Sequence, residues 1–166
     1  MSDIILSNWE QTASMGVEVV DRPQIRIASV RHVGSYMKVN EAFRRLHELA
    51  ASAGLLGPDT KLIGIYHDNP ESTPEDQLRS DAGITLAGGA RIPEGLNEVF
   101  IPSGRYAHVV HKGPYTGLGK SWDALRAWLG KSGERYGDGF SYELYRNTPM
   151  NAEPNDLVTD LYMPLK

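Results

Sequence analysis

Cysteine is absent from the 166 residues of this chain. Its absence excludes disulfide bonds, a thiol nucleophile and a thiolate metal site, and it fits a reducing compartment such as the cytoplasm. No apolar run reaches the length that crosses a membrane. The N-terminal residues also lack a basic segment followed by an apolar stretch. We therefore expect a cytoplasmic protein with neither a secretory signal nor a membrane partner.

An excess of positive charge is also missing. The sequence has 17 Lys and Arg against 21 Asp and Glu, which gives a net charge of −4 at pH 7. Nonspecific binding of nucleic acid depends on attraction between basic side chains and phosphates, so this balance argues against direct contact with nucleic acid. Hydrophobic residues make up 40% of the chain, which is typical of a globular protein with a buried core.

Motifs for phosphate binding, metal binding and serine hydrolysis are incomplete. GLGKS (117–121) resembles the end of a phosphate-binding loop, but Pro114 stands where that loop requires its first glycine. The histidines do not cluster at metal-ligand spacing, and the acidic stretch 68–76 lacks the alternating ligands of a calcium loop. The Gly-x-Ser-x-Gly pattern of serine hydrolases is absent. We expect no metal and no cofactor.

An internal repeat is the strongest positive signal in the sequence. Shifted by 79 positions, the chain matches itself without a gap. The matched pairs are His32 and His111, Gly34 and Gly113, Tyr36 and Tyr115, Gly54 and Gly133, Tyr66 and Tyr145, Pro70 and Pro149, Leu78 and Leu157, and Asp81 and Asp160. A fixed offset indicates one supersecondary unit used twice. We expect two copies related by an approximate two-fold axis, with a cleft at the seam between them.

Each copy is predicted to run strand, helix, strand, strand, after one more short strand. In the first copy, residues 26–36 alternate as a strand that ends in a turn, and residues 38–54 carry apolar side chains at helical spacing. Gly54 stands where a left-handed helix cap is expected, and Thr73 is predicted to cap one short helical turn. The remaining predicted segments are the strands 61–68, 81–86, 105–111, 140–147 and 159–165 and the helix 119–133.

These elements predict an α+β fold. Tandem β-α-β-β repeats with pseudo-two-fold symmetry would form a mostly antiparallel eight-stranded sheet, with the two main helices on one face. We expect one domain over residues 16–166, built from repeats at about 17–87 and 97–166, and a leader of unknown role at residues 1–15.

One inner strand differs between the copies in a way that matters chemically. Gly64 in KLIGIYHD corresponds to Glu143 in FSYELYRN, while the flanking Tyr66 and Tyr145 agree. Side chains alternate along a strand, so Glu143 and Tyr145 share one face.

The carboxylate of Glu143 has two interpretations. We expect Leu144 and its counterpart Ile65 to face the helix, which puts Glu143 on the other face, near the seam. There it is either a solvated or ion-paired residue, with Arg146 or Arg105 as partner, or a buried charge that receives a cation. Tyrosines around one acid suit flat, apolar, cationic ligands through stacking and cation–π attraction.

Several segments together resemble the GyrI-like small-molecule-binding domain. They are GIYHDNPESTPEDQLRSDAG (64–83), the turns HVGSY and HKGPY, the strand YELYRN (142–147) and the ending TDLYMPL (159–165). The resemblance covers about residues 17–166. Similar domains form the effector-binding part of AraC- and MerR-type multidrug regulators and the stand-alone DNA gyrase inhibitor. The resemblance implies two modules around a hydrophobic cleft, and it implies that Glu143 is the ligand-facing carboxylate.

Three functions follow as hypotheses. The first is binding of a hydrophobic, aromatic or cationic compound in the inter-repeat cleft, for drug or toxin sensing or sequestration. The second is hydrolysis of strained cyclopropyl electrophiles, as in some members of the family. Glu143 would act as general base toward water or stabilise the positive charge that develops on the opening ring, and a tyrosine hydroxyl such as that of Tyr145 would donate to the leaving oxygen. The third is interaction with DNA gyrase. In the first hypothesis Glu143 supplies charge, and the candidate aromatic residues are Tyr66, Tyr145, Tyr106, Tyr162, Trp128, Tyr36 and Tyr115.

Two groups of these candidates have a structural alternative. Trp128 lies on the apolar face of its predicted helix, where core packing is the default, although its smaller counterpart Leu49 leaves open a place at the cleft edge. Tyr36 and Tyr115 follow turn glycines at helix entrances, where they are either hydrophobic staples or residues of the cleft rim.

Overall fold

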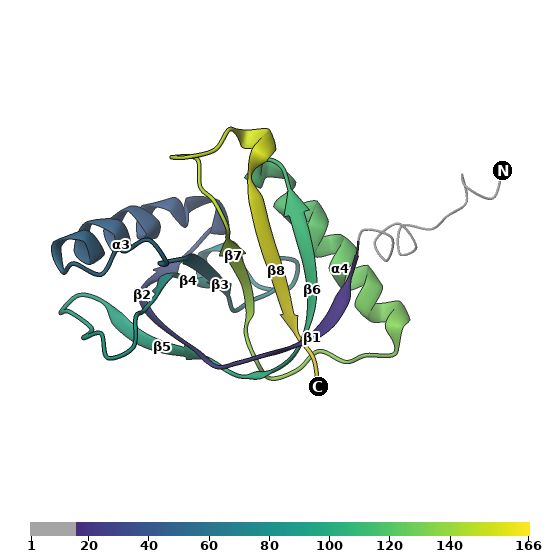
Figure 1. Ribbon diagram of the computed structural model, residues 1–166. Helices are drawn as coiled ribbons and strands as arrows, with labels where there is room; N and C mark the ends of the chain where they lie inside the picture. The colour runs from purple at the N-terminus through teal and green to yellow at the C-terminus, as the bar shows by residue number, and fades with distance from the viewer. Residues whose placement is uncertain (1–15) are drawn as a thin grey trace. The chain divides into compact units, whose positions relative to one another are not determined.

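The computed structural model describes residues 16–166 (Figure 1). The leader predicted at residues 1–15 lies outside the described residues. The strands are β1 (Glu18–Arg22), β2 (Ile25–Val33), β3 (Leu62–Tyr66), β4 (Arg79–Thr85), β5 (Asn97–Ile101), β6 (Gly104–Lys112), β7 (Ser141–Tyr145) and β8 (Val158–Pro164). The helices are α3 (Asn40–Ser52) and α4 (Leu118–Ser132), with short 3-10 turns at Tyr36–Lys38, Glu75–Gln77, Tyr115–Gly117 and Pro154–Asp156.

The element bounds repeat with the same offset as the sequence. The strands β1 to β4 are each followed 79 positions later by a strand of equal length, β5 to β8, and the 3-10 turns obey the same shift. The strands form an eight-stranded sheet in the order β1-β6-β8-β7-β3-β4-β2-β5. The predicted α+β fold, with a mostly antiparallel sheet, two main helices and a repeated β-α-β-β order, is confirmed.

The chain folds as two compact units, which are described separately. Unit 1 contains the segment that ends at Pro23, together with Ser103–Gly139 and Tyr145–Lys166. Unit 2 contains Gln24–Pro102 and Phe140–Leu144.

The short strand in front of each repeat pairs with a strand of the other repeat. In unit 1, β1 runs antiparallel to β6, with Val20 opposite Tyr106. In unit 2, β5 runs antiparallel to β2, with Val99 opposite Ile27. Each unit therefore takes its leading strand from the other half of the sequence.

In unit 2, the helix α3 packs on one face of the strands β2, β3 and β4. Its buried residues Leu46 and Ala50 contact a cluster that includes Ala28 and Ile84, and the partly buried Leu62 packs against the same cluster. The helix ends as predicted, because Gly54 follows it with a φ of 69°.

In unit 1, the helix α4 packs on the strands β6 and β8. Leu125 is the buried helix residue, and it contacts Val109, Leu161 and Met163. Gly133, in the left-handed conformation with a φ of 81°, ends this helix as predicted.

Two local predictions are wrong. Thr73 does not cap the short helical turn, because Pro74 is the N-cap of Glu75–Gln77 and makes no side-chain bond there. Ile65 does not face α3. Leu62 packs on the α3 side of β3, so alternation puts Ile65 on the opposite side, where it is in register with Asp81. Gly64, the counterpart of Glu143, shares the α3 side of β3 with Leu62, so the prediction that this strand position faces away from the helix is wrong for the first repeat.

Candidate functional site

Glu143 lies in the middle of β7 and is 4% exposed. Its carboxylate is therefore not a solvated surface group. The two arginines considered as its partners have carboxylates of their own. Arg146 donates to both oxygens of Asp160 at 2.7 Å, and Arg105 donates to Glu134 at 2.9 Å. Burial of an acid is costly, and the other repeat has a glycine at this position, which makes Glu143 a candidate functional residue.

Unit 2 brings together two of the predicted aromatic residues. The rings of Tyr36 and Tyr66 meet edge to face, with centroids 5.0 Å apart. The hydroxyl of Tyr36 donates to the carbonyl oxygen of Asp68 at 2.8 Å and accepts from the Asp68 N–H at 2.9 Å. Tyr36 is therefore fixed at its hydroxyl end, while both rings remain half-buried.

Unit 2 also contains a buried carboxylate that sequence reasoning did not single out. Asp81 is 2% exposed and accepts from Nε of Arg31 at 2.6 Å and from Nε2 of His67 at 2.7 Å. Burial alone would raise the pKa of Asp81, but the hydrogen bonds from His67 and Arg31 outweigh it and lower the pKa. The group is a fixed, compensated negative charge.

Unit 1 holds a second aromatic group around Tyr162. The ring of His108 stacks on Tyr162 at a centroid distance of 4.7 Å, and Tyr106 meets Tyr162 edge to face at 6.3 Å. The guanidinium carbon of Arg22 lies 4.5 Å from the centre of the same ring. Tyr162 thus already holds a cation of this chain in the geometry of a cation–π contact. Burial raises the pKa of the Tyr162 hydroxyl.

Asp160, next to this group, is the repeat counterpart of Asp81. It is 4% exposed and accepts from His108 and Arg146 at 2.7 Å. Burial opposes ionisation, but these hydrogen bonds prevail and lower the pKa of Asp160 to about 2. The sequence did contain a signal for these two hydrogen-bond networks. Asp81 and Asp160 are matched by the repeat offset, so a charged residue stands at the same strand position in both copies.

The remaining candidates lie in unit 1. Tyr115 meets Tyr145 edge to face at 5.6 Å, as Tyr36 meets Tyr66 in unit 2. Trp128 packs against the core cluster under α4, as expected for the apolar face of that helix. The structure thus groups the tyrosines as Tyr36 with Tyr66, Tyr115 with Tyr145, and Tyr106 with Tyr162.

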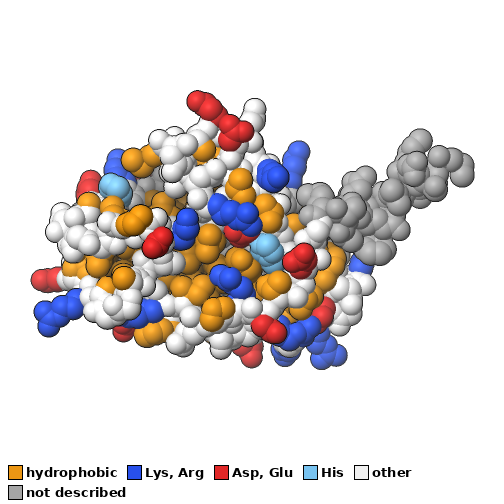
Figure 2. Space-filling view, viewed as in Figure 1, with side chains coloured by type: hydrophobic (Ala, Val, Ile, Leu, Met, Phe, Trp, Pro, Cys, Tyr) orange, Lys and Arg blue, Asp and Glu red, His pale blue; other side chains and the backbone are white. Residues whose placement is uncertain are grey.

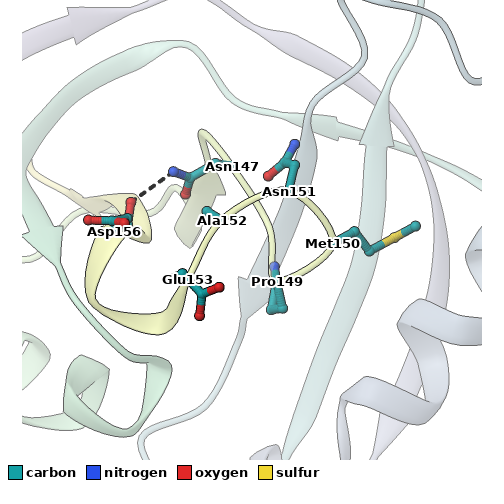
Figure 3. A pocket seen from close by; sticks show the side chains of 7 residues that line it. All are labelled: Asn147, Pro149, Met150, Asn151, Ala152, Glu153 and Asp156. Atoms are coloured by element: carbon teal, nitrogen blue, oxygen red, sulfur yellow. Dashed lines mark hydrogen bonds between the residues drawn. The ribbon is translucent and has the colours of Figure 1, made fainter.

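An open hollow of about 620 Å³ lies within the loop between β7 and β8 (Figure 3). Its lining residues are Asn147, Pro149, Met150, Asn151, Ala152, Glu153 and Asp156. No predicted site residue is among them. The side chains of Asn147 and Asn151 hold the loop itself, through bonds to the Asp156 carbonyl and the Thr148 N–H. The hollow is therefore formed by the loop alone, and Glu143 stays the candidate for the ligand-binding residue.

The surface carries both signs of charge. On the face drawn in Figure 2, Lys and Arg side chains are interspersed with Asp and Glu, and hydrophobic side chains show between them. Within residues 16–166, no helix is long and apolar enough to cross a membrane. In the same part of the chain, no three His, Asp or Glu side chains gather as a metal site would require.

Comparisons with known proteins identify the family and the fold of the chain. The chain is 30% identical over 159 residues to the DNA gyrase inhibitor of Erwinia billingiae, covering 91% of this chain and 97% of that relative. Its fold is similar to the EcmrR C-terminal domain (TM-score 0.77, 19% identity, 90% of this chain and 96% of the other). It is also similar to SAV2435 bound to tetraphenylphosphonium (TM-score 0.66, 11% identity, 90% and 93%). The model of the GyrI-like small-molecule-binding domain matches residues 15–166, and the chain belongs to that family.

Proposed function

We propose that this protein binds a hydrophobic, aromatic or cationic small molecule, with Glu143 as the negative group that the ligand meets. The observation that carries the proposal is the buried carboxylate of Glu143 in a chain whose family match spans residues 15–166. The first repeat has Gly64 at the equivalent position, so the fold does not require an acid there. The location of the ligand at the seam between the repeats stays a prediction.

The comparison of the repeats favours Glu143 over the other buried acids. Asp81 and Asp160 match one another across the repeats, and each is held by an arginine and a histidine of this chain. Glu143, in contrast, corresponds to a glycine in the other repeat. An aromatic cation would gain from a desolvated carboxylate and from tyrosine ring faces together. The relative SAV2435, bound to tetraphenylphosphonium, supplies a suitable probe of this kind.

The test is a calorimetric titration of the purified protein with tetraphenylphosphonium. Tetraphenylphosphonium has no hydrogen-bond donor, so the carboxylate of Glu143 would attract it through charge alone, which is worth a few kcal/mol at an effective dielectric constant of about 20. Glu143→Gln should therefore weaken binding about tenfold or more. Glu153→Gln, the same change in the loop hollow, is the matched control and should bind as the wild type does. Unchanged affinity in Glu143→Gln would contradict the assignment of Glu143, and no binding by the wild type would contradict the proposed class of ligand.

Action on DNA gyrase is a second candidate function. The relative from Erwinia billingiae that carries the name DNA gyrase inhibitor aligns with 91% of this chain at 30% identity. A supercoiling assay with purified gyrase and increasing amounts of this protein tests it. A dose-dependent loss of supercoiling supports inhibition. Full activity at a large excess of this protein contradicts it.

We propose the cytoplasm as the location for either role.

Hydrolysis is a third candidate function, and the same residues support it. Glu143 and Tyr145 lie two positions apart on β7, and both are buried. A general base and a hydroxyl donor on one side of a strand suit attack of water on a strained ring. Incubation with an electrophilic cyclopropyl compound separates the cases, because turnover that is lost in Glu143→Gln indicates an enzyme. Binding in a one-to-one ratio without product indicates a binding protein.

A further inference from the structure

Two buried hydroxyl groups lack a hydrogen-bond partner within residues 16–166. They are Oγ of Ser80 and Oγ1 of Thr159, and both residues are 0% exposed. The two positions are related by the repeat offset. Most buried polar side-chain atoms in proteins are paired, and an unpaired one costs free energy, so each exception needs a reason. The same exception in both repeats points to a shared reason.

In unit 2, Ser80 lies across from Tyr66, which forms a ring pair with Tyr36. Ser80 on β4 is directly in register with Tyr66 on β3 and with His32 on β2. Facing residues of antiparallel strands point to the same side of the sheet, about 5 Å apart. The hydroxyl of Ser80 therefore lies on the side of the sheet that carries the aromatic pair.

The neighbours of Ser80 are held by other contacts. His32 donates from Nε2 to the carbonyl oxygen of Ser35 at 2.9 Å. The hydroxyl of Tyr36 is bonded to the backbone of Asp68. Both bonds engage these polar atoms with the turn and the loop, and the hydroxyl of Ser80 has no hydrogen-bond partner within residues 16–166.

Unit 1 repeats the arrangement. Thr159 on β8 is in register with His111 on β6. The ring nitrogens of His111 lie 2.8 Å from Oγ of Ser121 and 3.0 Å from the carbonyl oxygen of Pro114. The tyrosine pair of this unit, Tyr115 with Tyr145, corresponds to Tyr36 with Tyr66. An anchored histidine, a tyrosine pair and an unpaired hydroxyl thus recur at equivalent positions.

We infer that the hydroxyl of Ser80 is a hydrogen-bonding group for the ligand, so that the protein selects aromatic cations that carry an oxygen, such as a phenol. The inference rests on the proposed function and narrows its ligand class. Tyr36 and Tyr66 are half-buried, and Ser80 is in register with Tyr66, so we place the aromatic ring of the ligand against this pair with its oxygen substituent toward Ser80. Net gains from one neutral hydrogen bond correspond to a preference of about two- to tenfold.

A matched pair of probes tests this selectivity on the full chain. Tetraphenylphosphonium and (4-hydroxyphenyl)triphenylphosphonium differ by one phenolic hydroxyl. The wild type should bind the hydroxylated cation about two- to tenfold more tightly. Ser80→Ala should lose that preference and keep its affinity for tetraphenylphosphonium. The control is Ser29→Ala, because Ser29 is equally buried in the same unit but its hydroxyl reaches the Asn97 carbonyl oxygen at 3.5 Å.

The outcomes separate the inference from the function on which it rests. Equal binding of the two probes by the wild type, or a preference that survives in Ser80→Ala, overturns the inference alone. Failure to bind either probe overturns the proposed ligand class as well. The unfolding midpoint without probe is a second measurement, which should be unchanged or raised in Ser80→Ala. A fall as large as that of Ser29→Ala would show that the Ser80 hydroxyl is already paired, against the inference.

Discussion

A buried aspartate occupies the same strand position in each repeat, and an arginine and a histidine contact its carboxylate in both. Asp81 is held by Arg31 and His67, whereas Asp160 is held by His108 and Arg146. The repeat offset equates His67 with Arg146, whereas Arg31 corresponds to Val110 and His108 to Ser29, so only one of the two partners stands at a shared position. At this shared position a hydrogen-bond donor at the end of an inner strand contacts the acid in both repeats, so a donor is kept although the residue type differs.

The Asp160 network predicts loss of stability in acid. Its hydrogen bonds lower the pKa of Asp160 from 3.8 to about 2. A lowered pKa stabilises the folded state above the unfolded value, and this contribution disappears as the pH falls from about 4 through 2. The shift corresponds to about 2 kcal/mol at neutral pH. The urea midpoint of the wild type should therefore fall more steeply between pH 4 and pH 2 than that of Asp160→Asn.

Asp123→Asn is the control for this measurement, because Asp123 forms an exposed pair with Arg126 on α4. Its midpoint should follow the wild type at every pH, since exposed pairs contribute little. Equal slopes for Asp160→Asn and the wild type would contradict the role given to Asp160. Part of the decline should persist in Asp160→Asn, because the pKa of Asp81 is lowered as well.

At the scale of elements, replacement by alanine of two glycines, one inside α4 and one at its end, should change the free energy of unfolding in opposite directions. Gly133 ends the helix with a φ of 81°, and an L side chain in that conformation costs about 1–2 kcal/mol. Gly130 lies inside the helix, and an added Cβ meets no atom within 4 Å. Gly130→Ala should stabilise by about 0.5–1 kcal/mol, and Gly133→Ala should destabilise. Thermal unfolding of both variants checks the prediction, and a shift of the same sign in both would contradict it.

The element order was predictable because hydrophobic spacing and turn glycines agree in both copies. The side of β3 that faces α3 was not predictable from the sequence. Ile63, Gly64 and Ile65 are all buried, and a strand that is buried on both sides shows no alternation of apolar and polar residues. The partners of β1 and β5 were not predictable either. The short strands are compatible with pairing inside their own repeat, and only the folded chain shows that each pairs with the other one.

Part of the candidate site was predictable from the repeat, and part depends on how distant strands pair. Comparison of the repeats singled out Glu143, because an acid replaces a glycine within otherwise matched strands. Tyr162 was predicted as a stacking surface, but its contacts with His108 and Arg22 depend on register across three strands. The hydroxyls of Ser80 and Thr159 carried no signal, since serine and threonine are common in strands and at turns.

At the scale of the whole molecule, the exchanged strands predict that the two halves of the chain depend on each other. A fragment that ends before β5 leaves β2 without its partner along Ile25–Ser29. A fragment that starts at β5 leaves β6 without β1 along Gly104–His108. Each lost ladder exposes backbone groups and apolar side chains that the full chain covers. Neither half, produced alone, should unfold cooperatively as a monomer in circular dichroism and size-exclusion experiments.

The control keeps both halves present and removes only the covalent link. Gly88 and Gly89 are exposed in the segment between β4 and β5, so a protease site inserted there should be cut without disturbing either core. After cleavage the two pieces should elute together and unfold in one transition, because β1 still pairs with β6 and β5 with β2. Separation of the pieces on cleavage, or a half that folds alone as a stable monomer, would show that the strand exchange contributes little to stability.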